Sequence, residues 1–294
     1  MADEPRRYRT IWISDLHLGT RNSQADAVLD LLRRCESETL YLVGDIVDGW
    51  ALARAWHWPQ AHNDVVQKLL RKVRKGTRVV YIPGNHDAFA RAYVGHEFGG
   101  IAVRERTFHV TADGRQLLVL HGDEFDGVVR HARWLSLLGS HAYTLLLRLN
   151  RPVNRVRAAF DLPYWSLSAY LKMKAKKAVQ VVGDFEAAVV EAARRAEADG
   201  VVCGHIHCAE DRTIGGVRYL NCGDWVESCT ALVEHIDGRL ELLRWRTSPV
   251  APAVDDDDDP DTDSLSGDGA ATPGVALRLV AGVVRSPLAR PPVP

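Results

Sequence analysis

Five short polar stretches, each following an apolar run, constrain this chain more than any other feature of its sequence. Each stretch offers carboxylate, amide or imidazole side chains next to glycine, and each apolar run is typical of a buried strand. The five stretches are Asp15-Leu16-His17, Gly44-Asp45, Gly84-Asn85-His86-Asp87, His121-Gly122-Asp123 and Gly204-His205-Ile206-His207. One such stretch alone is a common turn, but five in succession predict polar side chains that meet at one place in the fold.

The order of the predicted elements indicates an α/β fold. Strands are predicted at 8–14, 40–43 and 78–82, and they alternate with amphipathic helices at 23–34 and 62–75. This alternation is typical of a largely parallel layer with helices on its faces. In such layers ligands gather beyond the carboxyl ends of the strands, where the first three polar stretches fall.

The second half of the chain has a different pattern. Residues 107–111 and 115–120 predict a hairpin around Ala112-Asp113-Gly114, and a helix is predicted at 184–199. A strand follows at 201–203, and the strands at 217–220 and 230–236 are expected to pair with 239–245. Residues 126–180 carry Leu, aromatic and basic residues with two helical stretches, which predicts a helical insertion. The insertion either has a core of its own or forms a cap over a substrate.

We therefore expect one domain at 1–246, with the insertion inside it, and a tail at 247–294. The tail begins with Pro and Ala, continues with five consecutive Asp, and is then rich in Ser, Gly and Pro. This composition is typical of disorder.

Composition also excludes several classes of protein. No apolar run reaches the roughly 20 residues that span a bilayer, and the first ten residues lack the apolar core of a signal peptide. We therefore expect a protein that is soluble or peripheral. The formal net charge of −1 does not predict nucleic-acid binding. The five cysteines are an odd number in mostly strand-like contexts, so we expect reduced thiols, with Cys203 in the core and not on zinc.

The side chains of the five stretches predict a centre with two metal ions. The candidate ligands are Asp15, His17, Asp45, Asn85, His121, His205 and His207. They are too many for one tetrahedral or octahedral ion, but they suit two ions that share a carboxylate. A nitrogen and oxygen set without thiolate favours Mn²⁺, with Fe and Zn²⁺ as alternatives, over Ca²⁺ or Mg²⁺ alone. Two ions about 3.5–4 Å apart stabilise the attacking and leaving oxygens of a phosphoryl displacement.

The spacing suggests how these ligands converge. In Asp15-Leu16-His17 and His205-Ile206-His207, residues i and i+2 of an extended segment would project to the same side. Glycines beside the stretches would let the backbone crowd the site. They are Gly19, Gly44, Gly84, Gly122 and Gly204.

Together, the five stretches resemble the motif blocks of the calcineurin-like metallophosphoesterase superfamily, over about residues 10–225. The resemblance implies a layered β-sandwich flanked by helices and a hydrolase whose nucleophile is a hydroxide between two metals. It implies that Asp15, His17, Asp45 and His207 hold one metal, and that Asp45, Asn85, His121 and His205 hold the other. It further implies that His86 stabilises the phosphoryl oxygens or protonates the leaving group, with Asp87 orienting it.

A narrower resemblance is to the UDP-2,3-diacylglucosamine pyrophosphatases of the lipid A pathway. It is carried by the opening stretch 13–20, by residues 122–126 and by the helical insertion. It implies cleavage of a pyrophosphate to UMP and a lipid-sugar phosphate, with the insertion as a cap that holds acyl chains. It also implies a cytoplasmic location, at the inner face of the membrane where the substrate lies. In the best-known members of that family an Arg follows the Asn, whereas here the residue is His86.

Two alternatives stay open at this point. The chain could be a metallophosphatase or phosphodiesterase that acts on another lipid-linked or soluble nucleotide, or a binding module without catalysis. Candidate residues on the substrate side are Asp48, Arg91, Asp123 and Asp126. The oligomeric state does not follow from the sequence.

Overall fold

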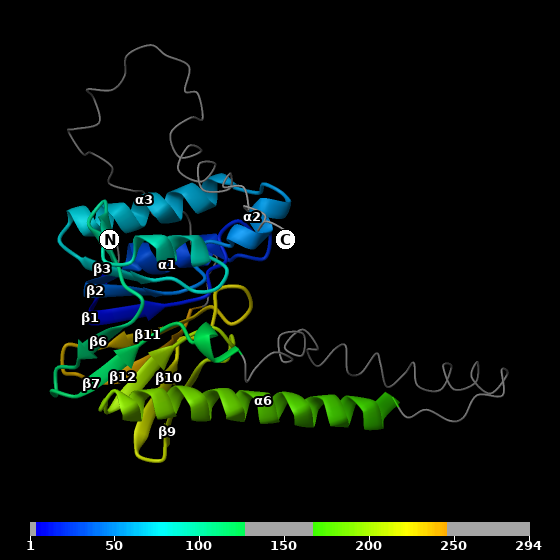
Figure 1. Cartoon of the computed structure of the whole chain (residues 1–294). Helices are drawn as coiled ribbons and strands as arrows, with labels where there is room; N and C mark the ends of the chain where they lie inside the picture. Colours follow the sequence, from blue (N-terminus) through cyan, green and yellow to red (C-terminus); the bar gives the residue numbers. More distant parts are fainter. Residues whose placement is uncertain (1–3, 127–166, 246–294) are drawn as a thin grey trace, which may run out of the picture. The chain divides into compact units, whose positions relative to one another are not determined.

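The computed structural model describes residues 4–126 and 167–245, without the side chains of 167–180. The described strands form two sheets, of seven and five strands (Figure 1). The order of the larger sheet is β12-β11-β1-β2-β3-β5-β4, and that of the smaller is β6-β7-β8-β10-β9. The predicted tail at 247–294 and most of the predicted insertion lie outside the described residues, so the domain boundaries stay a prediction.

The larger sheet contains the predicted parallel layer. Strands β1, β2, β3 and β5 run parallel, and β11, β12 and β4 are antiparallel to their neighbours. The elements that build this half are β1 (Arg6–Ile13), α1 (Ala25–Arg34), β2 (Cys35–Val43), α2 (Gly49–Arg54), α3 (Gln60–Arg74), β3 (Arg78–Ile82), the 3₁₀ helix η1 (Ala88–Tyr93), β4 (Glu97–Phe98), β5 (Ile101–Val103), β11 (Thr230–Glu234) and β12 (Leu240–Arg244). The sequence did not predict the short elements α2, η1, β4 and β5, whose few residues carry no clear period.

The smaller sheet is mixed. The hairpin of β6 (Thr107–Val110) and β7 (Gln116–Val119) has the predicted antiparallel pairing, and β7, β8 (Gly200–Cys203) and β10 (Val217–Asn221) run parallel. Strand β9 (Glu210–Ile214) completes this sheet. The expectation that 217–220 would pair with 239–245 is wrong, because β10 lies in this sheet and β12 pairs with β11 in the other.

One long helix, α6 (Leu167–Arg195), precedes β8. The sequence predicted two helices here, with the insertion ending near residue 180. That position instead lies inside α6, since the helix passes without a break through Gly183. A single glycine costs a helix only about 1 kcal/mol, and packing against β8 and β10 outweighs it.

Three hydrophobic cores join the elements into layers. Figure 1 shows α1 and α3 over the larger sheet and α6 along the smaller one. The first core lies between α1, α3 and the larger sheet, the second between α6 and the smaller sheet, and the third between the two sheets. Trp12 and Tyr41 stack with a centroid distance of 5.6 Å in the third core. The layers are therefore those of a β-sandwich flanked by helices, as predicted.

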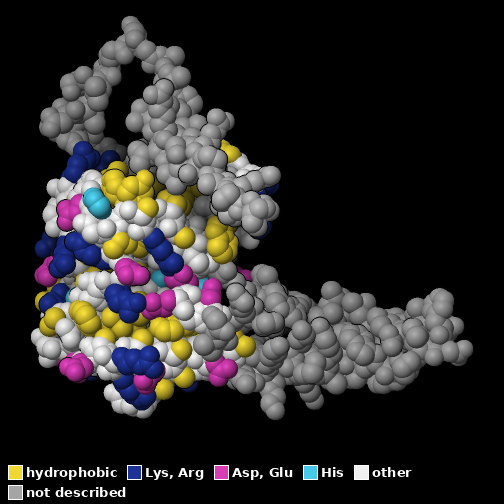
Figure 2. Space-filling model, in the orientation of Figure 1, with side chains coloured by type: hydrophobic (Ala, Val, Ile, Leu, Met, Phe, Trp, Pro, Cys, Tyr) yellow, Lys and Arg dark blue, Asp and Glu magenta, His cyan; other side chains and the backbone are white. Residues whose placement is uncertain are grey.

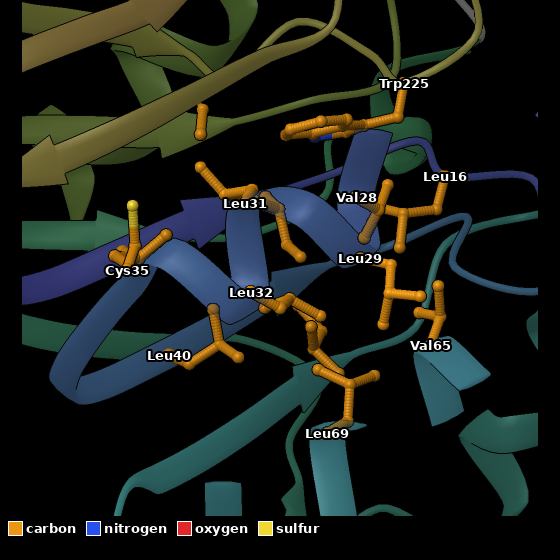
Figure 3. Close-up of a cluster of buried hydrophobic side chains, with 14 of the residues drawn as sticks. Leu16, Val28, Leu29, Leu31, Leu32, Cys35, Leu40, Val65, Leu69 and Trp225 are labelled. Atoms are coloured by element: carbon orange, nitrogen blue, oxygen red, sulfur yellow. The ribbon is translucent and has the colours of Figure 1, made fainter. Parts of the chain in front are cut away.

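The first core contains the apolar side chains whose helical spacing predicted α1 and α3. Val28, Leu29 and Leu32 of α1 pack with Val65 and Leu69 of α3, and all are buried (Figure 3). Each buried aliphatic side chain of this size contributes roughly 1.5–3 kcal/mol. This packing holds the first three parallel strands, and with them the loops at their carboxyl ends.

The surface has no single dominant character on the face that Figure 2 draws. Lys and Arg side chains of the described residues lie among Asp and Glu side chains there, with hydrophobic side chains between them. None of the described helices is long and apolar enough to cross a membrane. All five cysteines are free thiols, and Cys203 is fully buried at the end of β8, as predicted.

A buried acid connects the two sheets. Glu234 of β11 is fully buried, and its carboxylate accepts four hydrogen bonds. The donors are Arg9 Nη1 (2.8 Å), Thr10 Oγ1 (3.1 Å), His109 Nε2 (2.8 Å) and the backbone N–H of Ala112 (2.7 Å). Because His109 and Ala112 belong to the hairpin of the smaller sheet, Glu234 ties one sheet to the other.

We expect Glu234→Gln to lower the free energy of unfolding by about 3 kcal/mol, because it leaves the Arg9 guanidinium without its counter-charge and replaces one of the two oxygens that accept from the four donors. Burial by itself would raise the pKa of Glu234, but His109, the Ala112 N–H and Arg9 hold it below its ordinary value of 4.5. The ionised carboxylate therefore stabilises the fold above that value, and the stabilisation is lost as pH falls through the folded-state pKa. The loss caused by Glu234→Gln should thus shrink in acid.

Urea unfolding at neutral and acidic pH measures this effect. Glu241→Gln is a matched control, since Glu241 is partly exposed and pairs with His235 and Arg239. It should change stability by less than about 1 kcal/mol. An equally small loss for Glu234→Gln would contradict the bridging role.

Candidate metal centre

The five polar stretches meet at one edge of the sandwich. Each follows the carboxyl end of a strand: β1, β2 and β3 in the larger sheet, and β7 and β8 in the smaller one. Backbone hydrogen bonds join neighbouring stretches, from Asp15 N to Gly44 O (3.0 Å) and from Gly204 N to His121 O (3.1 Å). Across the two sheets, His205 N donates to Asp15 Oδ2 at 2.9 Å. The convergence predicted from the sequence is therefore present in the fold.

The described residues place ligand-type atoms in three overlapping groups, one of which joins His17, Asp45 and His86. The other two groups are the first and the second cluster. In the first, His207 Nε2 is 3.2 Å from Asp15 Oδ1 and 3.2 Å from His17 Nε2. In the second, Asp45, His121 and His205 lie together, with His121 Nε2 3.5 Å from Asp45 Oδ2. Asp45 Oδ2 is also 3.9 Å from His17 Nε2, so this carboxylate stands between the clusters.

Glycines make this crowding possible. A Cβ atom added to Gly44 would lie 2.1 Å from His121 Nδ1, and one added to Gly84 would lie 2.4 Å from Asp45 Oδ1. Such distances are impossible for real atoms, so both positions require glycine if the ligand atoms keep their places. This agrees with the sequence expectation that the backbone crowds the site.

The backbone of the ligands differs from the prediction. Asp15 and His17 have φ values of 54° and 48°, and those of His205 and His207 are 70° and 56°. Asp45 has φ of 53°. These residues adopt the left-handed conformation, so the expected extended i, i+2 geometry is wrong. Left-handed non-glycine residues are uncommon, cost of order 1–3 kcal/mol each and cluster at functional sites.

Several buried polar atoms of the centre have no hydrogen-bond partner among the described residues. They are Asn85 Oδ1 and Nδ2, His121 Nε2 and His205 Nδ1. A buried polar atom without a partner costs about 1–3 kcal/mol, so a group of them calls for an explanation. A cation at this place would take up the lone pairs of Asn85 Oδ1 and the two imidazoles. The donor set therefore fits divalent metal ions.

Charge pairs in the centre shift its acids and bases. Burial by itself would raise the pKa of Asp45, but the imidazoles of His121, His17 and His86 hold it below its ordinary range. Burial by itself would lower the pKa of His121, but the carboxylates of Asp45 and Asp15 raise it to about 10. Without a metal, His121 thus keeps a proton at neutral pH. A metal ion that binds there displaces this proton, so its affinity falls as pH falls.

His86 sits beside the clusters with a carboxylate partner. Its Nδ1 is 2.8 Å from Asp48 Oδ2, and its Nε2 is 4.0 Å from Asp45 Oδ2. The same oxygen of Asp48 lies 3.1 Å from His17 Nδ1. Asp48 also caps α2 by accepting from Ala51 N at 2.8 Å. Asp48 thus orients two imidazoles so that each presents Nε2 to the clusters.

Asp87 and Asp48 both have partners within the protein. The buried carboxylate of Asp87 accepts from the backbone N–H groups of Gly84 (2.6 Å) and Ile46 (2.7 Å), and it thereby connects the loop after β3 to the loop after β2. Asp48 is 6% exposed and faces the imidazoles of His17 and His86. The expected orienting role of Asp87 and the expected substrate contact of Asp48 stay predictions.

The other candidate substrate residues also have protein partners. Arg91 Nη2 donates to both carboxylate oxygens of Asp123, at 2.7 and 2.6 Å. Asp126 Oδ1 lies 2.5 Å from His205 Nε2. A substrate role for Arg91, Asp123 or Asp126 would therefore require an exchange of partners, and it stays a prediction.

The sequence did not single out Trp50, which lies at the rim of the centre. Its ring is tilted over His86 with a centroid distance of 4.3 Å, and the residue is 48% exposed. Its only sequence signal was its place two residues after Asp48. Because α2 was not predicted, neither the capping role of Asp48 nor the direction of Trp50 could be inferred.

The family model described as calcineurin-like phosphoesterase matches residues 8–209, which is more than half of the chain. This chain belongs to the calcineurin-like phosphoesterase family. The protein is thus a metal-dependent hydrolase of phosphoester or pyrophosphate bonds.

Within the calcineurin-like phosphoesterase family, the chain is similar to several curated proteins of one name. A protein named UDP-2,3-diacylglucosamine hydrolase from Pseudomonas savastanoi is 32% identical over 232 residues, which are 72% of this chain and 86% of the relative. A protein of the same name from Azotobacter vinelandii is 28% identical over 74% of this chain and 90% of its own length. Among solved structures, the phosphoesterase Yfce from E. coli aligns over 81% of this chain and 99% of its own, with 15% identity and a TM-score of 0.36.

Proposed function

We propose that this protein cleaves the pyrophosphate bond of UDP-2,3-diacylglucosamine or a closely similar lipid-linked nucleotide, releasing UMP and a lipid-sugar phosphate. The observation that carries the reaction is the convergence of Asp45 with the imidazoles of both clusters, beside His86. The names of the curated relatives, whose lengths this chain covers by 86–90%, support the substrate. The reaction would take place at the inner face of the membrane, where such a substrate resides.

We infer that the centre holds two divalent ions, with Mn²⁺ as the first candidate and Fe or Zn²⁺ as alternatives. One ion would be held by Asp15, His17, Asp45 and His207, and the other by Asp45, Asn85, His121 and His205. Their chemistry would be to neutralise phosphoryl charge and to lower the pKa of water. The nitrogen and oxygen donors, and the buried lone pairs without partners, support this inference.

His86 would donate a proton to the leaving group. Its Nδ1 faces the carboxylate of Asp48, and its Nε2 points to the clusters. His86 would therefore have to carry a hydrogen on both nitrogens to act as an acid, and the proton that it transfers would be the one on Nε2. In the reaction, a water oxygen forms a bond to phosphorus and the bond from phosphorus to the bridging oxygen breaks. His86 Nε2 would donate its proton to that bridging oxygen, or a hydrogen bond to the phosphoryl oxygens as charge builds on them.

A second candidate function rests on His86 itself. The best-known diacylglucosamine pyrophosphatases have an Arg at this position, and an imidazole cannot reproduce the bidentate contact of a guanidinium with phosphate. A neighbouring activity on another lipid-linked or soluble nucleotide is therefore the alternative. It would use the same centre and the same acid.

UMP release tests the proposal. The purified full chain is incubated with UDP-2,3-diacylglucosamine, Mn²⁺ and detergent, and UMP is quantified by chromatography. UDP-N-acetylglucosamine, which has the same pyrophosphate without acyl chains, and a chromogenic phosphodiester are run in parallel. Efficient release from the acylated substrate alone is the expected result.

The other outcomes separate the alternatives. Hydrolysis of the unacylated nucleotide at an equal rate would favour a soluble substrate, since acyl chains would then contribute nothing. Hydrolysis of the chromogenic ester alone would keep the phosphoesterase and reject the nucleotide. No hydrolysis of any of the three by metal-loaded protein would contradict the proposed function.

A further inference from the structure

The imidazole of His205 has two different environments on its two nitrogens. Nε2 lies 2.5 Å from Asp126 Oδ1, whereas Nδ1 is buried without a hydrogen-bond partner among the described residues. His205 as a whole is only 3% exposed. Its neighbours in the second cluster are Asp45 and His121.

These environments determine which nitrogen carries the hydrogen. A carboxylate accepts hydrogen bonds and does not donate them, so a neutral His205 has its hydrogen on Nε2 and a lone pair on Nδ1. His121 has the opposite arrangement. Its Nδ1 lies 2.9 Å from the carbonyl oxygen of Val43, which also only accepts, so a neutral His121 has its lone pair on Nε2. The two imidazoles of one cluster thus offer lone pairs from different ring nitrogens.

We propose that Asp126 is a positioning residue that fixes the tautomer and ring orientation of His205, so that Nδ1 is the nitrogen offered to a divalent ion. The inference rests on the proposed function only in taking the second cluster as a metal site. It gives Asp126 a role apart from the expected contact with the substrate, which stays a prediction. Carboxylates that hold a metal-binding imidazole in this way raise metal affinity, and their loss typically costs 10–100-fold.

The local fold explains why Asp126 reaches His205. The 3₁₀ helix η2 (Asp123–Phe125) begins directly after His121 and Gly122, and Phe125 N donates to Gly122 O at 3.1 Å. This turn carries the chain from one imidazole of the cluster back to the other. A single short segment therefore supplies both His121 and the carboxylate that holds His205.

The ring of Phe185 in α6 packs against His205 and against the turn that carries Asp126. The ring of Phe185 is fully buried and lies 6.0 Å from that of His205 and 6.4 Å from that of Phe125, centroid to centroid. A Cβ added to Gly122 would be 2.8 Å from Phe185 Cζ, so the turn packs directly on this ring. The Phe185 ring lies beside the imidazole of His205 and offers it no hydrogen-bond partner. The hydrogen bond to Asp126 therefore determines which ring nitrogen points into the cluster.

The other acids of the same turn serve as an internal comparison. Asp123 forms its bidentate pair with Arg91, and Glu124 Oε2 lies 2.9 Å from Arg106 Nη2. Both therefore face guanidinium groups. Glu124→Gln is thus a control that removes one negative charge from the turn without touching His205.

The test uses the full chain, with ¹⁵N-labelled histidine and metals removed, at a pH where the imidazoles are neutral. Long-range ¹H–¹⁵N NMR spectra report which ring nitrogen carries hydrogen, and His205→Gln assigns the signal. The unmodified protein and Glu124→Gln should show His205 protonated on Nε2. Asp126→Ala should shift His205 toward a mixture of tautomers. Asp126→Asn should preserve much of the Nε2–H form, because its amide oxygen still accepts a hydrogen bond.

Mn²⁺ titration by electron paramagnetic resonance gives the second readout. Asp126→Ala should weaken one of two bound ions by 10–100-fold, Asp126→Asn should weaken it less, and Glu124→Gln should leave it within about twofold. An Nδ1–H tautomer in the unmodified protein would overturn the proposal, whether or not any variant folds. Unchanged Mn²⁺ affinity in folded Asp126→Ala would also overturn it. Neither readout uses a phosphoester, so a wrong substrate would leave this inference standing.

Discussion

Asp45→Asn is expected to abolish phosphoester hydrolysis by this protein. Asp45 is fully buried, and its Oδ2 lies 3.5 Å from His121 Nε2, 3.9 Å from His17 Nε2 and 4.0 Å from His86 Nε2. Among the described carboxylates, only Asp45 belongs to two of the groups of ligand-type atoms, one with His17 and His86 and the other with His121 and His205. Removing its charge therefore weakens both proposed metal positions at once.

The main effect of the substitution is the loss of one buried negative charge. Asparagine has nearly the same shape, tolerates the left-handed conformation and can still accept the 2.8 Å hydrogen bond from His86 N. Because metal ions contribute several kcal/mol of transition-state stabilisation, we expect kcat/KM to fall by about 10³-fold or more. We also expect the protein to retain clearly less metal after gel filtration.

Elemental analysis of the filtered protein and initial rates on a chromogenic phosphodiester check both parts. Asp64→Asn is the control, since Asp64 lies on α3 and accepts from Gln60 Nε2 in the first turn of that helix. It should leave metal content and rate unchanged. Full metal content together with full activity in Asp45→Asn would reject the shared-carboxylate assignment.

His86→Ala is expected to separate proton transfer from metal binding. Loss of an acid–base group typically lowers kcat by 10²–10⁴-fold. The predicted metal ligands do not include His86, so the ions should stay. Asp48→Asn should lower kcat as well, because Asp48 Oδ2 faces Nδ1 of His86, but it should also weaken metal binding through His17.

His57→Ala is the matched control for this pair. His57 lies between α2 and α3, and its ring meets that of His62 at a centroid distance of 5.9 Å. Its loss should change neither kcat nor metal content. If His86→Ala lost its metals, His86 would be a ligand, and the assignment of the leaving-group acid would have to change.

The sequence predicted that the five polar stretches meet at one place, because strand ends carry a strong local signal. A buried strand followed by Asp, Asn or His next to glycine needs no knowledge of the rest of the chain, and parallel pairing then brings β1, β2 and β3 to one edge. The periodic spacing of apolar residues likewise predicted the layers of sheet and helix.

What the sequence could not predict depended on tertiary packing. The partner of Asp126 is a histidine 79 positions away, and that of Asp48 is set by a helix of six residues without a clear period. The course of α6 through Gly183 was hidden because packing on the smaller sheet overrides local propensity. The left-handed backbone of the ligands was missed because nothing in an Asp-Leu-His triplet distinguishes it from an extended one.

The left-handed backbone at these positions affects which substitutions would follow a loss of catalytic activity. At Asp15, His17, Asp45, His205 and His207, glycine would fit the conformation better than the residue present. Were the chain released from catalysis, glycine at these positions would relieve strain of order 1 kcal/mol each. A scaffold that had become a mere binding module would thus drift toward glycine and toward greater stability. All five positions carry ligand-type side chains, so this protein keeps backbone strain that glycine would relieve.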